Sequence, residues 1–211
     1  MKWLWVLLAA GLCPGCAGSL LSSANEAPDV YRLEAPMLTA RGEVLPLALA
    51  VSRPRAVSSL DTDRIAVVRP GGGFDYFAGM RWADAAPQML QGLLVQAIDA
   101  DGRFEAVVAA PSRVPTDRLL DVELRRFEAA YGTKAGAPRV RVELQASLVD
   151  LRRGLRVASF AAASEVDAAG DDRGAVIAAF DRATADAVRH VVARVRESGS
   201  AGAAPIPDAG P

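Results

Sequence analysis

The chain has 211 residues, with 24 lysine and arginine residues against 25 aspartate and glutamate residues, and a formal net charge of −1. This balance creates no large basic field, so it argues against a nucleic-acid partner, which is bound mainly by neutralising phosphates. The hydrophobic content of 51% is enough to bury a core, and the length fits one domain with tails.

The amino-terminal residues have the order of an export signal. Lys2 precedes a ten-residue apolar and glycine run over residues 3–12, and Cys16 follows after small residues. Such a run fits the apolar region of a signal peptide and is shorter than the roughly 20 residues that cross a bilayer. We expect residues 1–15 to be a signal peptide. The alternative is an ordinary secretory signal with incidental cysteines.

Cysteine usage points to a lipid anchor. The two cysteines, Cys13 and Cys16, both lie in the amino-terminal segment, so the folded domain has no disulfide and no thiol nucleophile. We predict that Cys16 becomes the first residue of the mature chain and carries the lipid. Residues 16–29 would then be the lipidated cysteine and a flexible tether, because the stretch is small and polar without periodicity. Ala17, which is not aspartate, is compatible by analogy with sorting to the outer membrane.

The first predicted elements are short strands. Residues 47–51 alternate leucine or valine with alanine, which indicates a strand with one buried face. Residues 65–68 and 74–78 are apolar runs on either side of the turn sequence PGGG at residues 70–73. We therefore expect these two runs to pair as a β-hairpin.

A helix is predicted over residues 84–102. Asp84 is expected to cap its start, Pro87 fits its first turn, and Gly102 is expected to end it. A strand over residues 104–109 should follow. The apolar residues that recur at helical spacing are Leu90, Leu93, Leu94, Ala97 and Ile98.

Three longer strands and a final helix complete the predicted domain. The strands are expected over residues 120–125, 139–148 and 155–164, and the second has the clearest alternation of apolar and polar residues. Residues 174–196 carry an apolar stripe at helical spacing, which is typical of an amphipathic helix.

Together these elements predict an α+β fold, with a mainly antiparallel sheet and two amphipathic helices packed on one face. Asp171 or Asp172 is expected to cap the final helix. The domain is expected over residues 30–196. Residues 197–211 are rich in Gly, Ala, Ser and Pro, and we expect them to be disordered.

The sequence predicts no active site. The only histidine, His190, lies on the final helix without a nearby cysteine or histidine to share a metal. Residues 71–73 lack the Gly-Lys-Ser/Thr of a phosphate loop, and the aspartates at 61–63 and 99–101 lack the glutamate of a calcium loop. We therefore expect no catalytic residue, no metal and no cofactor.

Two groups of side chains leave the interpretation open. Phe74, Tyr76, Phe77 and Trp82 fall within nine residues and indicate either core packing or a partner contact, since aromatic residues are enriched at interface hot spots. The arginines indicate either a solvated, salt-bridged face or a binding patch; they are Arg125, Arg126, Arg139, Arg141, Arg152 and Arg153.

A family resemblance is carried by the stretch from Ser59 to Val107. Leu60-Asp61 precedes a short strand, Tyr76-Phe77 precedes Arg81-Trp82, and a leucine-rich helix ends in Gly102-Arg103-Phe104. Downstream, the strand that ends in Phe127-Glu128 and the alanine-rich final helix agree with the same pattern. The sequence resembles the ABC-type transport auxiliary lipoprotein family, to which PqiC-like proteins belong.

The resemblance implies an auxiliary, non-enzymatic role beside a transporter. Such proteins are associated with an ATPase, a permease and a mammalian-cell-entry (MCE) domain protein, in systems linked to lipid movement between the two membranes. The expected partners are therefore this MCE-domain protein, the ABC permease and ATPase complex, and the outer membrane, reached from the periplasmic face through Cys16. Homo-oligomerisation stays open. The alternatives are a periplasmic shuttle that holds lipid in a cavity and a structural envelope lipoprotein.

Overall fold

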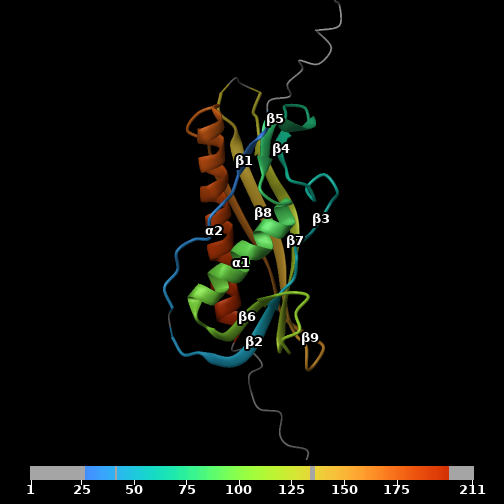
Figure 1. The fold of residues 1–211 in the computed structure, drawn as a ribbon, viewed down its shortest axis with the longest axis vertical. Coiled ribbons are helices and arrows are strands. Elements are labelled where there is room, and N and C mark those ends of the chain that lie inside the picture. Colours follow the sequence, from blue (N-terminus) through green and yellow to red (C-terminus); the bar gives the residue numbers. More distant parts are fainter. Residues whose placement is uncertain (1–26, 41, 134–135, 200–211) are drawn as a thin grey trace, which may run out of the picture.

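The computed structural model describes residues 27–40, 42–133 and 136–199. Within these residues the chain forms strands and two helices around a single sheet (Figure 1). The elements in chain order are β1 Asp29–Tyr31, β2 Leu45–Val51, β3 Arg55–Ala56, β4 Arg64–Val68, β5 Phe74–Trp82, α1 Ala86–Asp101, β6 Phe104–Ala109, β7 Arg118–Ala130, β8 Arg139–Asp150, β9 Leu155–Asp167 and α2 Arg173–Gly199.

Strand β7 organises the sheet. Along one side it pairs with β8, which pairs in turn with β9, and both ladders are antiparallel. Along the other side β2, β3 and β4 pair in succession with residues 118–120, 123–124 and 128–130 of β7, all in parallel. Strand β6 lies beyond β2, and β5 and then β1 lie beyond β4.

The sheet is mixed, so the prediction of a mainly antiparallel sheet is wrong. Of the eight pairs of strands in the described residues, five are parallel. The reason is that alternation of side chains reports which face is buried and carries no information on strand direction. Only β4 with β5, β7 with β8, and β8 with β9 are neighbours in sequence that close as antiparallel pairs.

Alternation of apolar and polar residues along β8 gives the sheet a buried face, which we call the dry face, and a solvent-exposed face. Val140, Val142 and Leu144 are at most 1% exposed, and polar residues such as Arg141 and Glu143 lie between them on the opposite side. The dry face is covered by both helices, which lie on the same side of the sheet in Figure 1. Helix α2 packs on β8 and β9, and α1 packs beside β6 and against α2.

The helix ends follow local chemistry. Gly102 ends α1 in the left-handed conformation, at φ 67°, which confirms the predicted C-cap. The residue before α1 is Ala85, without a side-chain cap, so Asp84 is not the cap that was predicted. Asp172 does cap α2, because its Oδ1 accepts a hydrogen bond from the backbone N–H of Ala175 at 3.0 Å.

The carboxyl ends of the two helices are tied together by an ion pair. Asp101, the last residue of α1, has a side chain only 2% exposed and accepts a hydrogen bond from Arg196 Nε at 3.1 Å. A buried carboxylate at a helix carboxyl end opposes the helix dipole, so it depends on this arginine. In the part of the chain that the structure describes, neither helix combines the length and apolar character needed to span a bilayer.

Candidate interaction surface

The candidate site lies on the sheet face opposite the helices, which we call the outer face. Residues paired directly across neighbouring strands project to the same side of a sheet. The register therefore sets one row across five strands, made of Tyr76, Ala66, Glu128, Arg141 and Glu165. The row is charged from β7 to β9 and aromatic at β5, so the outer face offers both chemistries to a partner.

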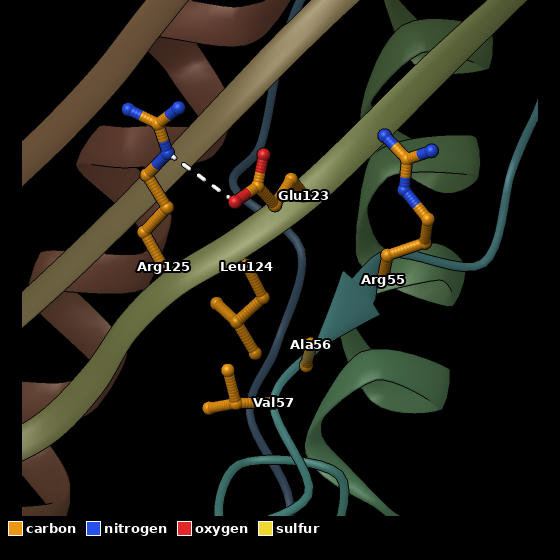
Figure 2. A pocket seen from close by; sticks show the side chains of 6 residues that line it. All are labelled: Arg55, Ala56, Val57, Glu123, Leu124 and Arg125. Carbon is orange, nitrogen blue, oxygen red and sulfur yellow. Dashed lines mark ion pairs between the residues drawn. The ribbon is translucent and has the colours of Figure 1, made fainter.

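The outer face is hollowed beside β3. This surface hollow has a volume of about 610 Å³. Figure 2 shows Arg55 on β3 and Glu123 and Arg125 on β7 around it, with the Glu123 carboxylate directed toward Arg125. The lining residues are Arg55, Ala56, Val57, Glu123, Leu124 and Arg125.

A β-bulge explains where the hollow forms. The pairing of β7 with β8 shifts between Leu124 and Arg126, so Arg125 is the inserted residue and both arginines are exposed. On its other side, β7 pairs with β3 only through residues 123–124 and with β4 only from Glu128 onward. Residues 125–127 of β7 thus have no strand beside them on that side among the described residues.

Ion pairs link the charges of the outer face. Arg125 Nε lies 3.5 Å from Glu123 Oε1, and Arg126 Nε lies 3.4 Å from Glu143 Oε2. Burial raises the pKa of Glu128 above that of an ordinary glutamate, and the nearby arginines only partly oppose this effect. Exposed pairs of this kind contribute about 0–1 kcal/mol each, so they can exchange partners at little cost. The arrangement fits a solvated face that a polar partner surface can contact.

Tyr76 forms the aromatic edge of the outer face. Its hydroxyl donates a hydrogen bond to the Ser59 carbonyl at 3.1 Å, and the Arg64 guanidinium lies 3.7 Å from the centre of its ring. Phe74, which is 44% exposed, meets the ring edge-on at 5.4 Å. Phe77, the neighbour of Tyr76, is half-buried and packs against the core.

Trp82, which the sequence left open between core packing and partner contact, lies in the core. Its side chain is 1% exposed and packs against Phe127 and Phe180, with ring centres 5.5 Å and 5.1 Å away. Its indole Nε1 is buried without an acceptor among the described residues. Trp82 therefore joins β5, β7 and α2, and a partner would sense it only through the stability of the fold.

The remaining predicted features carry no reactive geometry. Cys16 lies outside the described residues. His190 is exposed on α2. Among the residues that the structure describes, there is no group of three or more histidine, cysteine, aspartate or glutamate side chains able to hold a metal. What the outer face can do chemically is form hydrogen bonds, ion pairs and aromatic contacts.

Sequence reasoning missed two parts of this surface, the strand β3 and the bulge. β3 has only two residues, which is too short for any periodicity. The bulge did leave a signal. The buried residues of β7 occupy even-numbered positions up to Leu124 and then change to odd-numbered positions at Phe127. A strand can change from even to odd positions on the same face only if an extra residue is inserted between them.

Fold and surface together define a class of protein: a domain with a mixed sheet, one face of which is covered by two helices while the other face is charged. The sequence profile of the ABC-type transport auxiliary lipoprotein component matches residues 31–192. The chain belongs to this family. The members of this family are described as auxiliary lipoprotein components of ABC-type transport.

The chain is also similar to an individual curated protein. The chain is 29% identical over 163 residues to the uncharacterized protein bll6063 of Bradyrhizobium diazoefficiens, covering 77% of this chain and 43% of that relative. It therefore spans less than half the length of this relative.

Two crystal structures are similar in fold. Protein XCC0632 from Xanthomonas campestris, of the family DUF330, has a TM-score of 0.72 and 26% identity, covering 82% of this chain and 97% of that protein. The hypothetical protein CT253 from Chlamydia trachomatis has a TM-score of 0.53 at 7% identity, covering 73% of this chain and 98% of that protein. The latter similarity shows the fold alone.

Proposed function

We propose that this chain is the lipid-anchored periplasmic adaptor of a transport system that contains an ABC permease, an ATPase and an MCE-domain protein. It supports lipid movement between the inner and outer membranes without catalysing a reaction. The observation that carries the proposal is the family match, which extends over residues 31–192. The outer face adds a surface of suitable chemistry for docking.

The docking step in this proposal uses the outer face near the hollow and Tyr76. Val57 lines the hollow and is 64% exposed, and Arg55 beside it has a side chain 70% exposed. These side chains border the hollow, into which a partner side chain fits, and Phe74 is exposed at the aromatic edge of the same face. An MCE-domain protein with polar and apolar residues at its surface would exchange ion pairs with the arginines and cover the aromatic edge.

Photocrosslinking in intact envelopes tests the docking step. A photoreactive residue replaces Val57 or Phe74 on the outer face, and His190 on the exposed side of α2 serves as the matched control. We expect a crosslink to the MCE-domain protein from positions 57 and 74 and none from position 190. Equal crosslinking from all three positions, or none to any transporter subunit, would contradict the proposal.

The anchor is tested separately. We propose that Cys16 carries the acyl groups and that the outer membrane is the site of attachment. Intact-mass measurement of the mature protein should give the mass of a chain that begins at Cys16 with its lipid, and Cys16→Ser should release the protein from the membrane fraction. An unmodified Cys16 would reject the anchor and leave the docking result standing.

The alternative of a lipid shuttle has a distinct signature. Native mass spectrometry that finds lipid bound in stoichiometric amount, together with no crosslink to the MCE-domain protein, would favour the shuttle. Neither lipid nor a transporter crosslink would favour a structural envelope lipoprotein.

A further inference from the structure

The turn between β8 and β9 exposes an unusual run of side chains. Residues 151–156, with the sequence LRRGLR, are all exposed, and we call this segment the hairpin tip. Leu151 is 44% exposed and Leu155 is 61% exposed. Val114, which is 49% exposed, belongs to the neighbouring loop, and that loop is joined to the tip by the Leu151 N–H bond to the Asp117 carbonyl at 2.9 Å.

Hydrogen bonds and an ion pair at Asp150 fix the conformation of the hairpin tip. Asp150 Oδ1 accepts hydrogen bonds from the backbone N–H groups of Arg152 and Arg153, both at 3.0 Å. Asp150 is itself fixed by Arg118, whose Nη1 lies 2.5 Å from Asp150 Oδ2 in a pair of side chains 3% and 5% exposed. Gly154 adopts φ 63°, the left-handed region that the turn requires. The leucines are therefore presented on a fixed turn.

The hairpin tip and the neighbouring loop hold more arginines than acidic residues. Arg113, Arg152, Arg153 and Arg156 are exposed there. In residues 110–117 and 150–157 the only acids are Asp117 and Asp150. Asp117 forms an ion pair with Arg152 at 2.6 Å, and Asp150 forms an ion pair with the buried Arg118. The two segments therefore hold four arginines and two aspartates.

The tip lies at the opposite end of the domain from the first described strand. Asp29, which opens β1, pairs with Arg173 at the start of α2, at 2.5 Å. From there α2 runs 27 residues, about 40 Å, toward the end where β9 begins at Leu155. Figure 1 shows the turn before β9 at the lower end of the domain and β1 toward the upper end. The tip therefore points away from the side on which the chain enters the domain.

We propose that the hairpin tip inserts shallowly into an anionic phospholipid bilayer, with Leu151 and Leu155 among the acyl chains and the arginines at the headgroups. The leucine side chains match the acyl chains of a phospholipid, and the arginine side chains match its phosphate. The aliphatic part of an arginine lies along apolar surface while its guanidinium binds phosphate. Shape decides against a protein partner. A stable protein interface buries about 800 Å² on each side, whereas a convex six-residue turn offers little area. This inference goes beyond the proposed function and does not depend on Cys16.

Site-specific fluorescence tests the insertion. The full chain carries Cys13→Ser and Cys16→Ser in every sample, so the label NBD reacts only with an introduced cysteine and no acyl chain is present. One protein has Leu155→Cys at the tip, and the matched control has Val57→Cys, at an equally exposed apolar residue of the outer face (61% and 64%). Each is mixed with vesicles of phosphatidylglycerol and phosphatidylethanolamine, or of phosphatidylcholine alone.

We expect a blue shift and a rise in NBD emission at position 155 with the anionic vesicles only, and no change at position 57. Arg153→Gln with Arg156→Gln should reduce the apparent vesicle affinity about thirtyfold, which is about 2 kcal/mol at the usual value of about 1 kcal/mol per arginine. Arg125→Gln with Arg126→Gln, on the outer face, should leave it unchanged. Thermal melting of each variant confirms that it is folded.

Two results would overturn the inference. One is an emission at position 155 that is unaffected by anionic vesicles. The other is an equal response at positions 57 and 155, which would mean that the chain adsorbs without using the tip. If the vesicles give no response and a photoreactive residue at position 151 crosslinks a protein in envelopes, the tip is a protein contact instead.

Discussion

Replacing Trp82 tests whether this residue acts through the core. Its side chain is 1% exposed and packs against Phe127 and Phe180, so Trp82→Ala removes a large buried group that the surrounding sheet and helix cannot refill. Substitutions of this kind cost about 3–5 kcal/mol. For a domain of this size each kcal/mol lowers the melting temperature by about 2–4 °C, so we expect a fall of about 6–20 °C.

A second substitution separates packing from hydrogen bonding. Trp82→Phe keeps one ring against Phe127 and Phe180 and removes Nε1, which is buried without an acceptor among the described residues. The lost contacts and the relief of a buried donor act in opposite directions, so the net change should lie within about 1 kcal/mol.

Urea unfolding followed by far-ultraviolet circular dichroism measures both variants. Circular dichroism is preferred because both substitutions remove Trp82, so tryptophan fluorescence cannot be compared between the variants and the unaltered chain. If Trp82→Ala unfolds at the same urea concentration as the unaltered chain, the assignment of Trp82 to the core is wrong. If it is stable and only transporter crosslinking is lost, Trp82 is a contact residue.

Three further predictions concern ionisable side chains. Arg196→Met should cost about 3 kcal/mol in urea unfolding, because it leaves Asp101 buried and unpaired, and adding Asp101→Asn should restore part of the loss. Burial raises the pKa of Glu128, so its ionised form destabilises the fold above the unfolded pKa; Glu128→Gln should raise the melting temperature at pH 7 but not at pH 3. Burial, and then the hydrogen bond to Asp171, raises the pKa of Tyr131 to about 12. The neutral Tyr131 side chain therefore contributes its full stabilisation of the folded state below pH 10, and this contribution is lost as the pH rises from about 10 to about 12. Tyr131→Phe should lack that loss in melting experiments and lack the phenolate absorbance that appears near pH 12.

Regular periodicity made much of the fold predictable. The alternation in β8 gave a strand and its buried face, and the spacing of leucines gave α1, because burial imposes a period of two on strands and about 3.6 on helices. Gly102 was equally informative, since an αL helix end favours glycine. The hairpin of β4 and β5 followed from its glycine turn.

The direction of each strand and the identity of its neighbours in the sheet were not predictable from periodicity. Parallel pairing of β2, β3 and β4 with β7 is set by contacts between residues more than 60 positions apart, which leave no local pattern. Trp82 was ambiguous because aromatic side chains serve cores and interfaces alike. The hairpin tip was visible as a loop, but its fixed shape depends on the pair of Arg118 and Asp150, which only the folded chain brings together.

The position of β7 also determines the order in which the protein can be completed. Residues 45–68 contribute three strands whose shared neighbour lies at residues 118–130, so their ladders with β7 cannot form until the later half of the chain has been synthesised. Closing such distant pairs is entropically slow. Until β7 is made, the edges of β2, β3 and β4 that pair with it stay open, and a cell that makes this protein has to keep those edges from aggregating.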